Sequence, residues 1–140
     1  MKIELTKEQY KRLVELAFAG SWMINSWRVG DDQLLEYDEI VRHLYSFYKD
    51  FEADDLILYD EKDDLYLPTT KLEDKIFGFV DDYDDYSFWE ELLSRIAQRD
   101  AENNHETVTW DNKMQYEEKY QKEFETHGIE RLYVDWGNKK

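Results

Sequence analysis

The chain has no cysteine, one proline and only five glycines among its 140 residues. Without cysteine there is no disulfide, no thiolate nucleophile and no zinc site with cysteine ligands. The glycines are scattered, and they form neither a Walker loop nor a dinucleotide-binding fingerprint. A Gly-x-Ser-x-Gly motif is also missing. The sequence therefore lacks the parts of the common nucleotide-binding and serine-hydrolase sites.

Basic residues are scarce as well. The chain holds 18 Lys and Arg against 34 Asp and Glu, a net charge of −16. Residues 53–91 contain 3 basic and 14 acidic residues, so this stretch alone carries 3 − 14 = −11. Direct binding to nucleic acid or to an anionic membrane is disfavoured, because both need a basic surface. A basic protein partner suits this charge.

Long apolar runs are absent, whereas aromatic residues are abundant. The most apolar run, residues 16–24 ("LAFAGSWMI"), is too short to span a bilayer. No apolar signal core follows the start of the sequence, so we expect a cytoplasmic protein. Hydrophobic residues make up 41% of the chain and aromatic residues 16%. This composition predicts a folded protein with an aromatic-rich core or binding surface.

Capping motifs and apolar spacing predict four main helices. The first begins after a capping box at Thr6 and ends near Gly30, and its apolar second half predicts a central helix, buried all round, that includes Trp22. The second extends from about residue 34 to Phe51. The third begins at a capping box of Ser87 with Glu90 and ends near residues 103–104. The fourth covers residues 111–126.

The remaining segments predict a small β element. Two short apolar runs in residues 56–67 indicate a hairpin, and the alternation in residues 129–135 indicates a strand. Residues 71–80 fit a short helix or an irregular segment. We therefore expect a mainly α (α+β) fold: a compact single-domain helical bundle of about four main helices with a small β element. The domain covers residues 1–136, and residues 137–140 form a frayed tail.

Metal and catalytic motifs are incomplete. EF-hand loops starting at Asp60 or Asp82 lack the required glycine and the acid at position 12. Glu102 and His105 have the Glu-x-x-His spacing of di-iron bundle proteins, but such a site needs two pairs. The sequence therefore assigns no catalytic residue, no metal site and no cofactor.

The densest acidic cluster lies in "VDDYDDYS", with a second acidic run upstream. Asp84 and Asp85 would precede a helix starting at Ser87, where the helix dipole favours anions. This role leaves the other acids unexplained. They form either a solubilising face or a surface for a positive partner. The candidate interaction residues are Asp81, Asp82, Tyr83, Asp84, Asp85, Tyr86, Asp63 and Asp64.

Two classes of function fit these observations. The leading hypothesis is a non-catalytic cytoplasmic interaction module whose acidic, Tyr-rich face binds a basic protein. It could act as an adaptor, an inhibitor or an immunity or antitoxin-type protein, and in a sharper version as a DNA mimic. The alternative is a small hydrolase or metal-dependent enzyme that uses acids such as Glu102, Asp81 or Asp84. The sequence leaves the oligomeric state open.

Overall fold

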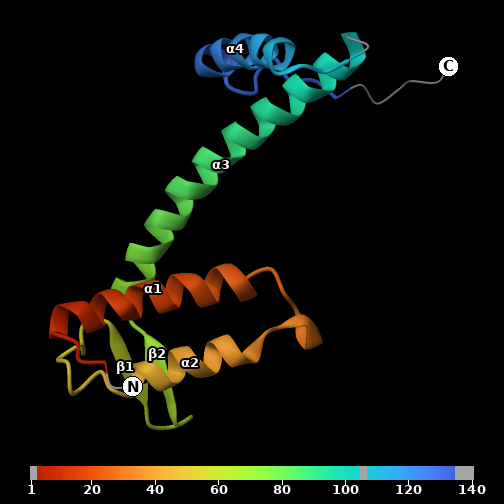
Figure 1. Cartoon of the computed structure of the whole chain (residues 1–140). Helices are drawn as coiled ribbons and strands as arrows, with labels where there is room; N and C mark the ends of the chain where they lie inside the picture. Colours follow the sequence, from red (N-terminus) through yellow and green to blue (C-terminus); the bar gives the residue numbers. More distant parts are fainter. Residues whose placement is uncertain (1–2, 105–106, 135–140) are drawn as a thin grey trace. The chain divides into compact units, whose positions relative to one another are not determined.

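The chain divides into two units, Met1–Asp82 and Tyr83–Lys140, and the computed structural model describes residues 3–104 and 107–134 (Figure 1). The predicted mainly α fold with a small β element is confirmed. The single domain over residues 1–136, with its tail at residues 137–140, stays a prediction. In chain order the elements are α1 (Lys7–Asn25), η1 (Gly30–Asp32), α2 (Leu35–Tyr45), β1 (Ile57–Asp60), β2 (Leu65–Pro68), α3 (Thr70–Asn104) and α4 (Trp110–His127).

Helix α1 begins where the capping box predicts. Thr6 Oγ1 accepts from the Gln9 N–H at 3.2 Å, and the Thr6 N–H donates to Gln9 Oε1 at 2.9 Å. The helix ends at Asn25 rather than near Gly30. The Asn25 side chain accepts from the Leu34 N–H at 3.0 Å and donates to the Leu34 carbonyl at 3.1 Å. These two bonds join the end of α1 to the residue before α2, across η1.

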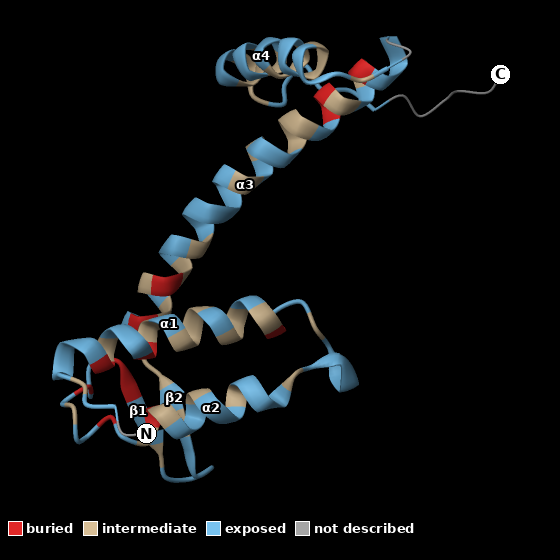
Figure 2. Cartoon of the chain, in the orientation of Figure 1, coloured by how far each residue is buried: buried red, intermediate tan, exposed pale blue. Residues whose placement is uncertain are grey.

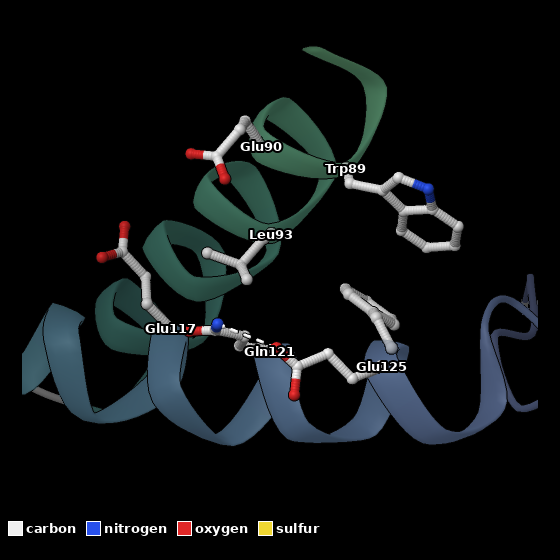
Figure 3. Close-up of a pocket in the computed structure, with 7 residues that line it drawn as sticks. Trp89, Glu90, Leu93, Glu117, Gln121 and Glu125 are labelled. Carbon is white, nitrogen blue, oxygen red and sulfur yellow. Dashed lines mark hydrogen bonds between the residues drawn. The ribbon is translucent and has the colours of Figure 1, made fainter. Parts of the chain in front are cut away.

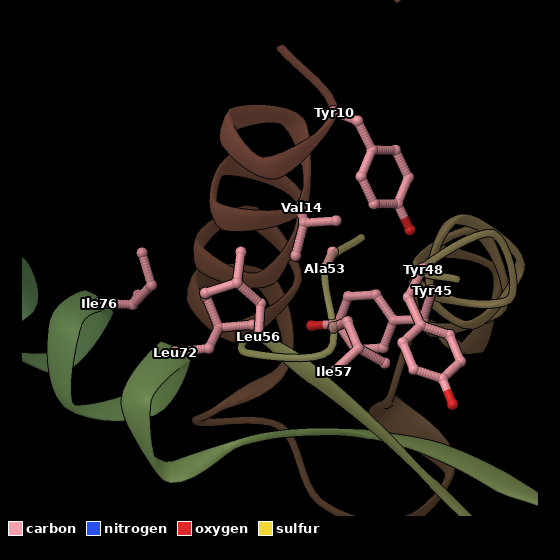
Figure 4. Close-up of a cluster of buried hydrophobic side chains, with 9 residues drawn as sticks. All are labelled: Tyr10, Val14, Tyr45, Tyr48, Ala53, Leu56, Ile57, Leu72 and Ile76. Carbon is pink, nitrogen blue, oxygen red and sulfur yellow. The ribbon is translucent and has the colours of Figure 1, made fainter. Parts of the chain in front are cut away.

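The core of the first unit lies between α1, the end of α2, the hairpin and the start of α3 (Figure 4). The rings of Tyr10 and Phe51 stack with centroids 4.2 Å apart. The Tyr10 hydroxyl donates to the Leu44 carbonyl at 2.7 Å, which satisfies this buried polar group. The buried residues of this cluster are Tyr10, Val14, Tyr45, Tyr48, Ala53, Leu56, Ile57, Leu72 and Ile76.

The predicted hairpin is confirmed as the antiparallel pair β1–β2, with Asp60 opposite Leu65. Its turn contains no glycine. Asp64 takes the required left-handed conformation instead, with φ 52°, which aspartate tolerates better than most residues. The Asp60 carboxylate accepts from the Lys62 N–H at 2.9 Å and so stabilises the turn.

Helix α2 is shorter than predicted, because the chain turns after Tyr45 and does not remain helical to Phe51. Glu52 has a positive φ of 51°, and the Ala53 N–H donates to the Tyr48 carbonyl at 2.8 Å. This reversal places Ala53 in the core with no exposed surface. Burial of Ala53 and the residues after it therefore outweighs the apolar spacing that predicted a helix as far as Phe51.

Helix α3 corrects two predictions. Residues 71–80 are neither irregular nor a separate short helix, and Ser87 is not an N-cap, because one helix runs from Thr70 to Asn104. The stretch contains no proline, and Gly78 costs a helix only about 1 kcal/mol. The Leu72 N–H donates to Thr69 Oγ1 at 3.4 Å near the true start. The Ser87 hydroxyl donates instead to the Asp84 carbonyl, within the helix.

The second unit contains the end of α3 and all of α4. Helix α4 begins at a capping box of Thr109 and Asn112 and ends before Gly128, close to the predicted bounds. The strand predicted for residues 129–135 is wrong over its described part, because residues 129–134 form a turn and an irregular segment. Residue 135 lies outside the described residues.

The prediction that the first helix is buried all round is also wrong. Leu16 is 70% exposed and Met23 63% exposed. Trp22 is half-buried, and its ring meets Phe77 edge-on at 5.8 Å. Figure 2 shows buried residues on only part of α1. Among the described residues, no helix has both the length and the apolar character needed to cross a membrane.

Candidate functional site

The predicted cluster of residues 81–86 lies within α3, and all six residues are exposed. At about 100° per residue, Asp81, Asp82, Asp84 and Asp85 fall within an arc of roughly 160°. Tyr83 falls on the opposite side of the helix, whereas Tyr86 lies about 40° beyond Asp82, at the edge of this arc. The cluster lies inside α3 and not before a helix N-terminus as predicted, and its role as an interaction face stays a prediction.

Among the residues that the structure describes, the four aspartates have no positive partner. Three pairs of them are spaced i,i+3 or i,i+4, where like charges destabilise a helix. The nearest basic residues on α3 are Lys75 and Arg95. Lys75 pairs with Glu15 at 2.8 Å, and Arg95 pairs with Glu91 at 2.8 Å. Within the described residues, the cluster is thus an unneutralised anionic patch.

The other two predicted residues, Asp63 and Asp64, lie in the exposed turn between β1 and β2. The Tyr59 hydroxyl donates to Asp64 Oδ1 at 2.5 Å. This hydrogen bond to a carboxylate is the main reason that the pKa of Tyr59 rises to about 12. Asp64 therefore helps to order the hairpin, whereas Asp63 has no partner among the described residues.

A groove in the second unit brings aromatic and acidic side chains together (Figure 3). It has a volume of about 530 Å³ and lies between α3 and α4. Trp89 and Phe124 form one end, and their ring centroids lie 5.8 Å apart. The carboxylates of Glu90, Glu117 and Glu125 surround the remainder of the groove. Leu93 and Gln121 complete the lining.

The three carboxylates of the groove are partly free to bind a ligand. Glu125 Oε1 accepts from Gln121 Nε2 at 2.9 Å, shown as a dashed line in Figure 3. Glu117 has a cation, Lys113 Nζ, at 3.3 Å. Glu90 has no hydrogen-bond or ion-pair partner among the described residues. The lining holds three acids and no base, so the groove favours a cation.

The aromatic end adds a second means of holding a cation. A guanidinium or ammonium group over a tryptophan or phenylalanine ring is attracted by about 0.5–2 kcal/mol, most strongly when water is excluded. Gly128 lies beside the Trp89 ring: a Cβ there would be 3.9 Å from the ring edge. Together, the aromatic wall and the carboxylates match an arginine or lysine side chain, which has an apolar stem and a charged end.

Contacts beyond the groove hold α4 against the end of α3. The Tyr120 hydroxyl donates to the Asp100 carboxylate, which also pairs with Arg99 at 2.8 Å. The Tyr120 hydrogen bond, followed by that from Arg99, lowers the pKa of Asp100. Lys113 Nζ lies 3.0 Å from Ser94 Oγ, which adds a polar link between the helices. These links fix the two helices that supply the groove side chains.

The acids suggested for an enzyme are not brought together into a recognisable centre. Asp81 and Asp84 share the exposed patch, whereas the Glu102 carboxylate accepts from Gln98 Nε2 at 2.7 Å. His105 lies outside the described residues. In residues 3–104 and 107–134, no group of three or more metal-ligating side chains is placed to hold an ion.

Sequence reasoning did not find the groove. Trp89 and Leu93 lie on α3 and Phe124 on α4, and no local pattern in the sequence pairs these two helices. The narrow apolar stripe of residues 111–126 was the available signal. A helix with so narrow a stripe covers only part of its neighbour, so aromatic side chains remain at the edge of the contact.

Comparisons with protein-family models, with curated proteins and with solved structures found no match to this chain. The function is therefore argued from the geometry and charge of the site alone.

Proposed function

We propose that the protein is a non-catalytic interaction module that binds a basic protein partner. The groove between α3 and α4 carries the proposal, because it places Trp89 and Phe124 beside three carboxylates without a basic residue in its lining. An arginine or lysine side chain of the partner would enter the groove. Its stem would pack on the rings, and its charged end would meet Glu90 and the neighbouring carboxylates.

The aspartate patch on α3 has a different part in this proposal. Its charges are exposed and unneutralised, so they raise the negative potential without forming a pocket. Exposed charges of this kind act mainly on the rate of association, because they attract an oppositely charged partner over about 10 Å at moderate salt. The patch would steer the partner, and the groove would retain it.

The proposed compartment is the cytoplasm. The cysteine-free sequence suits a reducing environment, since it makes no use of disulfides. Adaptors, inhibitors and immunity-type proteins are all modules of the proposed kind. The enzyme alternative gains no support from the described carboxylates, because Asp81 and Asp84 lie on an exposed part of α3 and Glu102 is hydrogen-bonded to Gln98.

The experiment is a pull-down at low and high salt, followed by binding kinetics on the purified partner. Two variants separate the two roles. Replacing Glu90 and Glu125 by glutamine should speed dissociation, because groove contacts are lost. Replacing the four aspartates of the patch by asparagine should slow association and reduce its salt dependence.

A matched control comes from acids outside both surfaces. Replacing Glu36 and Glu39, both exposed, by glutamine removes two negative charges from the first unit. If this control and the groove variant weaken binding equally, net charge rather than the groove explains the affinity. If the groove variant and the patch variant both bind the partner as the unmodified protein does, the proposed function is contradicted.

A further inference from the structure

A second cleft lies entirely in the first unit, between α1, α2 and β2. Its volume is about 340 Å³, at the small end of the range for ligand sites. Most of its wall surface is apolar, and several polar side chains converge on it, as in many small-molecule sites. The aromatic residues are Phe18, Trp22, Tyr45 and Tyr66.

One carboxylate of this cleft is held in a fixed position. Asp38 Oδ1 accepts from the Ser21 hydroxyl and from Asn25 Nδ2, the latter at 3.2 Å. Asn25 is itself 9% exposed and fixed by its two bonds to the Leu34 backbone. Asp38 Oδ2 has no partner among the described residues. The carboxylate is therefore oriented by one oxygen and free to bind through the other.

A positively charged side chain lies one helical turn after Asp38 on α2. Arg42 also lines the cleft, and it lies four residues after Asp38 on α2. The sequence spacing favours an ion pair between the two, yet no such pair forms within 4.0 Å among the described residues. Side chains at this spacing have Cβ atoms about 5–6 Å apart. The cleft thus presents an unpaired anion and an unpaired cation side by side.

The cleft also borders an unsatisfied polar group. Tyr45 is 2% exposed, and its hydroxyl has no hydrogen-bond partner among the described residues. Buried hydroxyls are nearly always paired, because an unpaired one keeps its desolvation cost. The hydroxyl itself is shielded from solvent, so it lies beneath the cleft lining and takes no part in the contacts of a bound ligand.

We propose that this cleft binds a free α-amino acid with an aromatic or large apolar side chain. The ammonium group would pair with Asp38 Oδ2, and the carboxylate would pair with the Arg42 guanidinium. The side chain of the ligand would pack among Trp22 and its aromatic neighbours. The ligand is a zwitterion rather than a simple amine, because Arg42 would repel a ligand that carried only a positive charge.

The proposal is independent of the acidic groove, which lies in the other unit. A small ligand in the cleft contacts both α1 and α2, so binding would stabilise the first unit through linkage. A purely structural role is the competing explanation: Ser21, Asp38 and Asn25 would then only tie the two helices together. The two explanations differ in whether Asp38 Oδ2 and the Arg42 guanidinium bind a ligand.

The test is a calorimetric and NMR titration of the full chain with three probes. L-phenylalanine carries both charges, phenethylamine lacks the carboxylate, and 3-phenylpropionate lacks the ammonium group. We expect L-phenylalanine to bind with a dissociation constant below about 1 mM, and each analogue to bind at least about tenfold more weakly. Shifts should centre on the Trp22 indole N–H. No binding of L-phenylalanine at about 10 mM, or equal binding of the analogues, would overturn the proposal.

Variants identify the two charged contacts. Arg42→Gln removes an exposed side chain with no described partner, so the fold should persist while affinity falls at least about tenfold. Lys62→Gln, in the hairpin turn, is the matched loss of one positive charge. Asp38→Asn should likewise abolish recognition of the ammonium group, with Glu39→Gln as its control. If Arg42→Gln and Lys62→Gln bind L-phenylalanine equally, the cleft does not recognise the ligand carboxylate, and the proposal fails.

Discussion

Neutralising the aspartate patch on α3 should make that part of the helix more stable. The change is Asp→Asn at positions 81, 82, 84 and 85, which keeps the shape and nearly the same helix propensity. Three like-charge pairs disappear, each costing about 0.2–0.5 kcal/mol, so the gain is about 0.6–1.5 kcal/mol. No ion pair is lost in return, because the patch has no positive partner among the described residues.

Amide hydrogen exchange of residues 81–88 measures this effect directly. A gain of about 1 kcal/mol in local stability slows exchange roughly fivefold. Added salt should protect the same amides in the unmodified protein and have much less effect in the variant, because salt screens the repulsion. Asp54→Asn is a control whose expected change in local stability has the opposite sign. Asp54 pairs with Lys49 at 2.7 Å, so its neutralisation removes a favourable ion pair. Faster exchange at residues 81–88 in the variant would refute the reasoning.

Three further predictions concern the first unit. Leu72→Ala should lower the free energy of unfolding, measured with urea, by about 2–5 kcal/mol, because Leu72 is fully buried. Leu16→Ala, at an exposed position, should lower it by less than about 0.5 kcal/mol, and equal losses would contradict the assigned core. Tyr45→Phe should raise the melting temperature, because it removes a buried, unpartnered hydroxyl; a marked fall would reveal a missed partner. Asp55 lies between two lysines that lower its pKa to about 2, so it should stabilise the fold above the unfolded aspartate pKa near 4 and lose this effect as the pH falls toward 2. The stability of Asp55→Asn should therefore depend less on pH in this acid range. An unchanged pH dependence of unfolding would contradict the lowered pKa.

The magnitude for Asp55 follows from its position. Its carboxylate lies 2.9 Å from Lys11 Nζ and 2.5 Å from Lys71 Nζ. The side chain is 39% exposed, so solvent screens both pairs, and we expect about 1 kcal/mol rather than the value that the full pKa shift implies. These pairs connect α1, the loop before β1 and the start of α3.

Local signals predicted the element boundaries only where no tertiary contact opposed them. The Thr6 capping box and the end of α4 at Gly128 were both found, because each is decided by a few neighbouring residues. The same type of signal failed at Ser87. A capping box needs the chain to leave the helical conformation, and nothing between Thr70 and Asn104 forces it to do so.

The candidate site was harder to predict from the sequence than the fold. The acidic cluster was visible in composition, but its placement inside a helix reverses the expected effect of its charge from stabilising to destabilising. The groove depends on Trp89 of α3 meeting Phe124 of α4, a pairing 35 residues apart that no local pattern specifies. The alternation in residues 129–134 was not sufficient for a strand, since the sheet contains only β1 and β2 among the described residues.

The proposed function requires that the groove between α3 and α4 receives a basic side chain. NMR titration with an end-blocked peptide containing one arginine, beside the same peptide with norleucine in its place, tests it most directly. We expect saturable shifts at the Trp89 indole N–H and around Phe124 for the arginine peptide alone, and their loss when Glu90 and Glu125 are replaced by glutamine. Equal shifts with both peptides, or shifts confined to the aspartate patch of α3, would contradict it.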